Sequence, residues 1–191
     1  MIIVCIHGRA GSGKDTLANF LVKKNFIKIA LADQIKKIAQ ELWGFNHNHL
    51  WGPSSLRNES IPRFPDLTPR DVLIKIGDAV NELDPYAWTR LVSEYIERID
   101  SYYYKNAKNY FVIPDIRYLR EYEYLKACFK EHKVIFIKIV RQSYQSNLLE
   151  KHKKHSSENE EINDCYFDKI INNKNIDDLE PEINEYIEGL L

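Results

Sequence analysis

The chain has 191 residues, of which 44% are hydrophobic and 29% charged, and its formal net charge is −1. This length lets a single domain bury a core, and the balanced charge argues against a partner that is nucleic acid or a membrane surface. Its three cysteines are widely spaced and indicate neither a metal site nor a disulfide framework. Neither a signal-peptide pattern nor an apolar run of roughly 20 residues is present. We therefore expect a cytoplasmic globular protein.

The first predicted elements are a strand over residues 2–7 and a helix over residues 13–24, with a glycine-rich segment between them. The segment reads Gly8-Arg9-Ala10-Gly11-Ser12-Gly13-Lys14, which is the G-x-x-x-x-G-K spacing of a phosphate-binding loop. The backbone N–H groups of such a loop converge on an anion, and the following helix adds positive potential at its N-terminus. We predict that the loop binds a nucleoside triphosphate through Gly11, Ser12, Gly13, Lys14, Asp15 and Thr16.

The residue after the loop lysine departs from the common motif. It is Asp15 rather than Ser or Thr, and Thr16 follows it. The hydroxyl at this position normally reaches Mg²⁺. The sequence leaves three ligands for the metal ion open: Thr16, Asp15 or water.

The next elements are a short strand over residues 26–30 and a helix with one apolar face at Ile35, Ile38, Ala39, Leu42 and Trp43. Residues 44–69 then lack periodicity and hold four of the seven prolines, which indicates a long irregular insertion. A helix follows over residues 72–83. Asp84-Pro85 is typical of an N-cap and first turn, and predicts another helix to residue 99.

The second half of the chain continues to alternate strands and helices. In order, we predict a strand at 110–113, a helix at 118–131, a strand at 134–140, a polar segment at 141–161, a strand at 166–171 and a helix from about 178. Such alternation favours a three-layer α/β/α fold with a five-stranded parallel sheet. Ligands of these sheets bind beyond the carboxyl ends of the strands, where we expect Asp33, Asp115, Arg117 and Arg141.

Asp115 follows an apolar strand, as the acidic residue of a second nucleotide-binding motif does. There it would orient Mg²⁺ or its water ligands. The alternative is a helix N-cap or turn aspartate, and Pro114 just before it makes the local geometry unusual.

Two further groups of basic residues are candidates for phosphate contacts. Arg141 opens the polar segment that contains Lys151, which we interpret as a lid that neutralises charge and excludes water; the alternative is a solvated basic loop whose field Glu158 and its neighbours weaken. Arg57, Arg63 and Arg70 flank the proline-rich insertion, where their guanidinium groups suit a second phosphorylated substrate. Trp51 or Trp88 would form its apolar wall, although Trp88 also suits the core.

These segments together resemble the deoxynucleoside monophosphate kinases of bacteriophages. The matching segments run from the first strand to the last helix: GRAGSGKDT at 8–16, LADQIK at 31–36, LWGPS at 50–54, Arg57-Asn58, LTPR at 67–70, PDIR at 114–117, Val140-Arg141 and HSSE at 155–158. The resemblance implies a single adenylate-kinase-like domain. Its parts are a core (1–43, 108–141 and 162–191), a helical monophosphate-binding insertion (44–107) and a lid (142–161).

The resemblance also implies ATP and Mg²⁺, a deoxynucleoside 5′-monophosphate as acceptor, and compatibility with a homodimer. By position, it implies that residues 11–16 hold ATP, that Arg57, Arg70 and Arg117 contact the acceptor, and that Arg141 and Lys151 belong to the lid. Together with the residue chemistry, we predict catalytic roles for Lys14, Asp115 and Arg141. We predict substrate contacts for Asp33, Arg57, Asn58, Arg70, Trp88, Arg117 and Lys151. The acceptor is a phosphate oxygen that is already ionised, so alignment and charge neutralisation would suffice without a catalytic base.

Three other functions stay open at this point. Animal-type phosphomevalonate kinases share the G-K-D loop and the D-x-R that follows the third strand, and are the nearest competing enzymes. A GTP-binding switch would need Ser or Thr after Lys14, a later D-x-x-G and N-K-x-D, and the sequence has none of them. An inactive scaffold is the remaining alternative, because Asp15 and Pro114 depart from common patterns.

Overall fold

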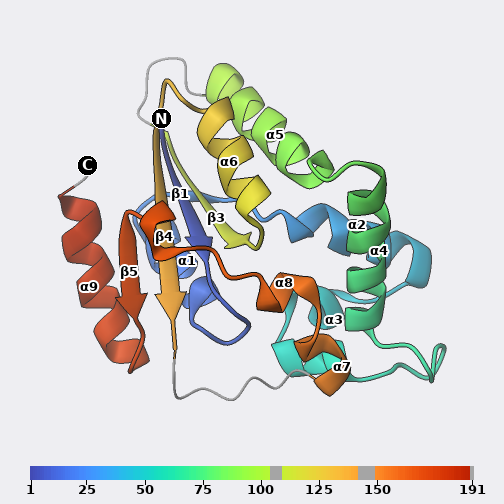
Figure 1. Ribbon diagram of the computed structural model, residues 1–191. Coiled ribbons are helices and arrows are strands. Elements are labelled where there is room, and N and C mark those ends of the chain that lie inside the picture. Colours follow the sequence, from blue (N-terminus) through green and yellow to red (C-terminus); the bar gives the residue numbers. More distant parts are fainter. Residues whose placement is uncertain (104–108, 142–148, 190–191) are drawn as a thin grey trace.

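The computed structural model describes residues 1–103, 109–141 and 149–189. Its strands form one parallel sheet in the order β2-β3-β1-β4-β5 (Figure 1). They are β1 (Ile2–His7), β2 (Ile27–Lys28), β3 (Tyr110–Ile116), β4 (Lys133–Val140) and β5 (Lys169–Asn172). The predicted five-stranded parallel sheet is therefore confirmed.

The helices follow the predicted alternation, with additional short helices in the two segments that lack periodicity. They are α1 (Lys14–Lys23), α2 (Ala32–Trp43), α3 (His47–Trp51), η1 (Ser54–Asn58), α4 (Pro69–Leu83), α5 (Ala87–Tyr103), α6 (Leu119–Cys128), α7 (Glu150–Lys153), α8 (Ser156–Asn159), η2 (Asp164–Tyr166) and α9 (Ile176–Glu188). No helix in these ranges is both long enough and apolar enough to cross a bilayer.

Helices cover both faces of the sheet, as the prediction of three layers requires. On one face, Leu17 of α1 and Ile183 of α9 are fully buried against β1 and β4. On the other face, Ile96 of α5 and Leu125 of α6 pack on β1 and β3 (Figure 1). A strand covered on both faces needs apolar side chains in both directions, which explains the nearly continuous apolar run of β4.

β3 continues beyond its predicted end at Ile113. Cys5 of β1 pairs with Ile113, whereas His7 pairs with Ile116, so β3 contains one extra residue at this point. Pro114 lies within this stretch and has no N–H to donate to the ladder. The irregularity is a β-bulge, which bends a strand and re-aims its side chains. It lies where β3 approaches the glycine-rich loop.

The segment 44–69 is not irregular throughout, because it contains α3 and η1. Ala39, Phe45, Leu50 and Val72 form a separate small core between α2, α3 and α4. α3 begins at an N-cap, where the Asn46 side chain accepts a hydrogen bond from the backbone N–H of His49. Helices of five residues are too short to produce a visible 3.6-residue period, so the sequence pattern missed them.

Several boundaries differ from the predicted ones. Asp84 is the C-cap of α4, and α5 begins at Ala87. The Asp84 side chain also accepts a hydrogen bond from the backbone N–H of Tyr86 at 2.9 Å, as an N-cap side chain does. η2 precedes β5 where a single strand over 166–171 was expected, and α9 begins at Ile176. The division into core, insertion and lid stays a prediction, and its segments 104–108 and 142–148 lie outside the described residues.

Candidate active site

The glycine-rich segment forms a loop between β1 and α1 in which three positions exclude a side chain. Gly11 and Gly13 have φ angles of 79° and 107°, which L-residues rarely adopt. At Gly13, a Cβ would also lie 2.6 Å from Nδ2 of Asn173. At Gly8, a Cβ would lie 2.6 Å from the carbonyl oxygen of Ile139. Conformation and close approach therefore both require glycine here, as the motif predicted.

Asn173, which follows β5, contacts the loop through its side chain, and the sequence analysis did not assign it a role. Its Nδ2 donates a hydrogen bond to the carbonyl oxygen of Ser12 at 2.8 Å. The side chain is buried at 4% exposure. Its contact with the loop spans 161 positions in sequence, so no local pattern could have revealed it.

Lys14 begins α1 and folds back over the loop, where its Nζ donates to the carbonyl oxygen of Arg9 at 2.8 Å. Its exposure is 7%. Burial and, to a smaller extent, the nearby charge of Arg117 lower the pKa of Lys14 to about 7, although the carboxylates of Glu158, Asp15 and Asp115 act in the opposite direction. A phosphate at the loop would add negative charge beside the ammonium group and favour its protonated form.

We expect ATP binding to be accompanied by proton uptake at alkaline pH. A phosphate beside Lys14 stabilises the ammonium form, so it raises the Lys14 pKa from about 7 toward its ordinary value. At pH 8 the free protein then holds Lys14 mostly neutral, and binding takes up nearly one proton. Calorimetric titration in buffers of different ionisation enthalpy measures this number. The same uptake with tripolyphosphate is the control, and binding without uptake would contradict the Lys14 assignment.

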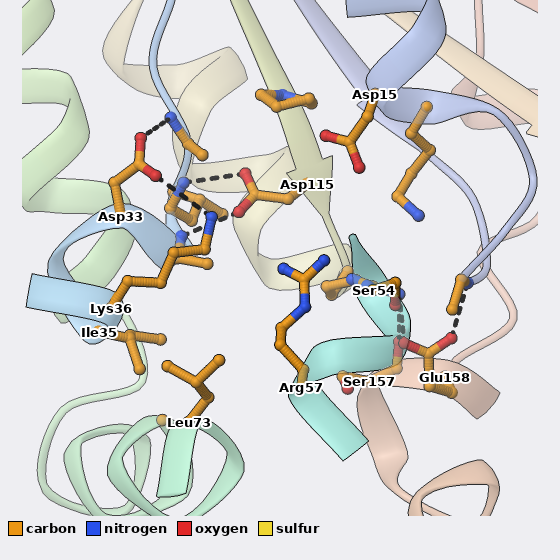
Figure 2. Close-up of a pocket in the computed structure, with 18 of the residues that line it drawn as sticks. Asp15, Asp33, Ile35, Lys36, Ser54, Arg57, Leu73, Asp115, Ser157 and Glu158 are labelled. Atoms are coloured by element: carbon orange, nitrogen blue, oxygen red, sulfur yellow. Dashed lines mark hydrogen bonds and ion pairs between the residues drawn. The ribbon is translucent and has the colours of Figure 1, made fainter. Parts of the chain in front are cut away.

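A cavity of about 930 Å³ extends from the loop toward α2, η1 and α4 (Figure 2). The structure brings most of the predicted site residues to it. The lining includes Lys14, Asp15, Thr16, Asp33, Arg57, Arg70, Trp88, Asp115, Arg117 and Arg141. Apolar atoms of Ile35 and Leu73 form part of its wall. The lining thus combines lysine and arginine side chains with carboxylates, such as those of Asp15 and Glu158, and with an apolar part.

Two arginines of the insertion are fixed in place beside this cavity. Arg70 donates from Nε to Oδ1 of Asn58 at 2.7 Å and from Nη2 to Oγ of Ser54 at 2.9 Å. Burial lowers the pKa of Arg70 to about 10, and the charge of Arg57 acts in the same direction. Arg57 donates from Nη1 to the carbonyl oxygen of Leu50 at 3.0 Å, while its buried Nε has no hydrogen-bond partner among the residues that the structure describes. An anion between these cations would relieve their repulsion.

Asp33 lines the cavity and also positions an aromatic side chain there. Its Oδ1 accepts a hydrogen bond from Nε1 of Trp51 at 3.1 Å, and Nζ of Lys36 lies 3.4 Å from the same oxygen. Trp51 therefore stands at the wall with a fixed indole plane. Trp88 also lines the cavity, but it is 8% exposed and belongs to the main core under α5.

The Asp115 carboxylate caps the start of α2 with both of its oxygens. Its Oδ1 accepts from the backbone N–H of Leu31 at 2.9 Å, and its Oδ2 accepts from that of Ala32 at 2.8 Å. Burial raises its pKa, although these two hydrogen bonds act in the opposite direction. A carboxylate here also stabilises the positive end of the helix. The role of Asp115 toward Mg²⁺ stays a prediction.

Asp15 and Thr16 both line the cavity beside the loop. Burial alone would raise the pKa of Asp15, but the charges of Lys28, at 3.4 Å, and of Lys14 hold it below its ordinary value. Mg²⁺ in nucleotide sites uses one or two protein oxygens together with phosphates and water, and this pair fits that donor set. In the described ranges no three His, Cys, Asp or Glu side chains are grouped to hold a metal ion.

The helices α7 and α8, within the predicted lid, contact the insertion through two histidines of the polar segment, to which the sequence analysis gave no separate role. Nε2 of His152 lies 2.8 Å from Oδ1 of Asp71, and Nε2 of His155 lies 3.0 Å from Oδ1 of Asp78. Both aspartates belong to α4, so these pairs join the two parts across the cavity. Lys151 belongs to α7, and its side chain lies outside the described part of the chain.

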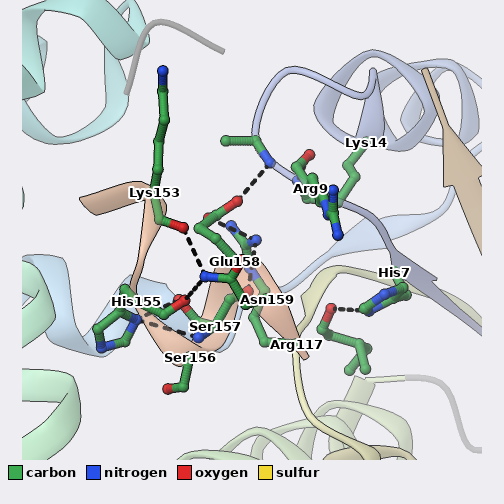
Figure 3. A network of polar contacts seen from close by, with 12 residues as sticks. His7, Arg9, Lys14, Arg117, Lys153, His155, Ser156, Ser157, Glu158 and Asn159 are labelled. Atoms are coloured by element: carbon green, nitrogen blue, oxygen red, sulfur yellow. Dashed lines mark hydrogen bonds and ion pairs between the residues drawn. The ribbon is translucent and has the colours of Figure 1, made fainter. Parts of the chain in front are cut away.

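Glu158 of α8 lies against the loop (Figure 3). Its Oε2 accepts a hydrogen bond from the backbone N–H of Ala10 at 2.9 Å, and its Oε1 lies 2.8 Å from Nη1 of Arg117. The sequence analysis considered only the effect of its charge on the lid. The HSSE segment was a signal, but it did not show that the carboxylate reaches a loop 148 positions away.

The sheet and the glycine loop together define an α/β protein of the P-loop type. Two solved structures are similar to it in fold: TT1252 from Thermus thermophilus (16% identity, TM-score 0.45, covering 100% of this chain and 98% of that one) and a dephospho-CoA kinase from Campylobacter jejuni (19% identity, TM-score 0.46, covering 99% and 96%). No family profile and no curated protein sequence matches the chain. Similarities this distant assign no activity, so the function must be argued from the site.

Proposed function

We propose that the chain is an ATP-dependent kinase that phosphorylates a deoxynucleoside 5′-monophosphate, with Mg²⁺ held beside Asp15 and Thr16. The observation that carries the proposal is a single cavity with the phosphate-binding loop at one end and the guanidinium groups of Arg57 and Arg70 within reach of the same space. Two anions brought together need cations from both sides. An enzyme that joins two phosphates needs this arrangement.

The chemistry follows from charge and alignment. An oxygen of the acceptor phosphate forms the new bond to the γ-phosphorus, and the bond from that phosphorus to the bridging oxygen breaks. No proton moves, because the attacking oxygen is already ionised. Lys14 and the loop amides hold the donor phosphates, Arg57 and Arg70 hold the acceptor, and Arg117 and Arg141 neutralise the charge between them.

The wall of the cavity favours an acceptor that carries a flat apolar group. Trp51, oriented by Asp33, and the apolar atoms of Ile35 and Leu73 suit a nucleobase better than a short branched alcohol chain. This supports a nucleotide acceptor over a phosphomevalonate-like one, and the assay below separates the two.

The deciding experiment measures ADP release with each deoxynucleoside and ribonucleoside monophosphate. Phosphomevalonate, dephospho-CoA and buffer alone are the comparison acceptors. We expect rapid ADP release with at least one deoxynucleoside monophosphate and slow release in buffer. Release only with phosphomevalonate or dephospho-CoA would replace the acceptor. ATP use that ignores every acceptor indicates a switch-like hydrolase, and binding without consumption indicates a scaffold.

A further inference from the structure

The carboxylate of Glu158 lies against the glycine-rich loop (Figures 2 and 3). It accepts a hydrogen bond from a loop amide, that of Ala10 at 2.9 Å, and pairs with Arg117 at 2.8 Å. Only 12% of the side chain is exposed. A loop amide and a guanidinium group are the donors that a phosphate uses in proteins. Glu158 therefore makes the contacts of a bound anion.

The position of Glu158 is set by its neighbours on α8 and not by the carboxylate alone. Oγ of Ser156 lies 2.9 Å from the hydroxyl oxygen of Tyr118. The carbonyl oxygen of Ser157 accepts from Nη1 of Arg117 at 3.3 Å. These contacts fasten α8 to the junction of β3 and α6, and the pairing of His155 with Asp78 fastens its start to α4. The segment thus holds Glu158 against the loop.

Glu158 also lies on the boundary between two cavities. The second cavity, again about 930 Å³, lies on the other side of the loop beside Gly8, Arg9 and Ser12. The residues that line both cavities are Ala10, Arg141, Ser157 and Glu158. A polyphosphate that runs along the loop toward the arginines of the first cavity would pass this boundary, where the carboxylate now stands.

The charges around Glu158 are those that a phosphate would neutralise. Arg117 pairs with it directly, and the negative charge of Glu158 also stabilises the protonated forms of Lys14 and Arg70. A second anion beside Ala10 would lie within a few ångströms of the carboxylate, and like charges at that distance repel strongly. The two anions therefore exclude each other from this position.

We propose that Glu158 is a built-in competitor of the nucleotide phosphates: its carboxylate holds the anion position of the loop until a polyphosphate displaces it, together with α8. Displacement frees Arg117 to face the transferred phosphate. The identity of the polyphosphate rests on the proposed function, whereas the competition itself requires only an anion at the loop.

The test compares the binding of ATP and of tripolyphosphate to the wild-type protein and to Glu158→Gln by calorimetry. Glutamine keeps the size of the side chain and removes its charge, so both ligands are expected to bind about tenfold more tightly, the effect of losing one charge-assisted competitor. Glu161→Gln is the matched control. It removes the same charge from a side chain that is 85% exposed and pairs with Arg9 at 3.5 Å, and we expect less than about a twofold change.

A second measurement does not depend on a variant. Tripolyphosphate added to the wild-type protein should speed amide hydrogen exchange in α8, because the segment leaves its contacts with Tyr118 and Arg117. Unchanged or weaker binding by a folded Glu158→Gln, or unchanged exchange in α8 at saturating tripolyphosphate, overturns the proposal. Failure of the wild-type protein and the variant to bind either ligand overturns this proposal and the proposed function together. Tighter binding by the variant without transfer to any monophosphate removes only the proposed function.

Discussion

Lys14→Ala is expected to lower kcat by about a thousandfold while leaving the protein folded. Lys14 is the first residue of α1, and its ammonium group lies over the loop that would hold the donor phosphates. Negative charge shifts onto the β-phosphate as the bond from the γ-phosphorus to the bridging oxygen breaks, so removing this cation costs more in the transition state than in the bound ground state. Steady-state kinetics at saturating ATP and acceptor measures the loss.

The fold should tolerate this substitution because Lys14 does not contribute a favourable buried charge. Burial holds its pKa at about 7, which shows that the charged form is less stable here than in water. We expect the melting temperature of Lys14→Ala to stay within a few degrees of the wild type. Lys23→Ala is the control on the same helix, since that side chain is 67% exposed and pairs with Glu180 at 3.8 Å. A near-normal kcat in Lys14→Ala would refute the assignment of the loop.

Arg70→Ala is expected to lower kcat/KM for the acceptor by about a hundredfold, with only a small change in the KM for ATP. The guanidinium group is partly buried beside Arg57, and burial has lowered its pKa to about 10. Such a group gains most from a dianionic ligand, because the ligand supplies the hydrogen bonds and counter-charge that water provides at an exposed arginine. Kinetics with the acceptor varied at saturating ATP gives the comparison.

Two further variants separate acceptor binding from support of the insertion. Arg70→Lys keeps the charge but loses the donors to Asn58 and Ser54, so we expect an intermediate loss. Arg63→Ala is the control within the same insertion, where the guanidinium group stacks on the ring of Phe64 and does not line the cavity. If acceptor kinetics in Arg70→Ala match those of Arg63→Ala, Arg70 has no place in the acceptor site.

The parts of the fold that were predicted correctly are those encoded by local pattern. The glycines at positions 8, 11 and 13 are required by backbone conformation and by close approach, and such requirements leave a readable motif. The apolar run of β4 follows from burial on both faces of the sheet. Segments shorter than two helical turns, such as α3 and α8, leave no periodic signal, and they were missed for that reason.

The course of β3 shows a limit of a different kind. Pro114 predicted the end of a strand, because proline cannot donate a ladder hydrogen bond. The sheet instead accommodates it in a bulge, and pairing resumes between His7 and Ile116. Pro114 does mark an interruption of the pairing between β1 and β3. Pairing with β1 nevertheless continues the strand to Ile116, and this course brings Asp115 to the start of α2.

The sequence by itself determined the glycine-rich loop between β1 and α1, the alternation that produces a parallel sheet, and the end of β4 that Arg141 follows. Only the tertiary structure decided which polar groups meet: Glu158 with Ala10, Asn173 with Ser12, and His152 with Asp71. The physical reason is that periodicity and motifs report the backbone conformation and burial of neighbouring residues. A hydrogen bond between side chains far apart in the chain depends on how whole elements pack, and it leaves no trace in either local pattern.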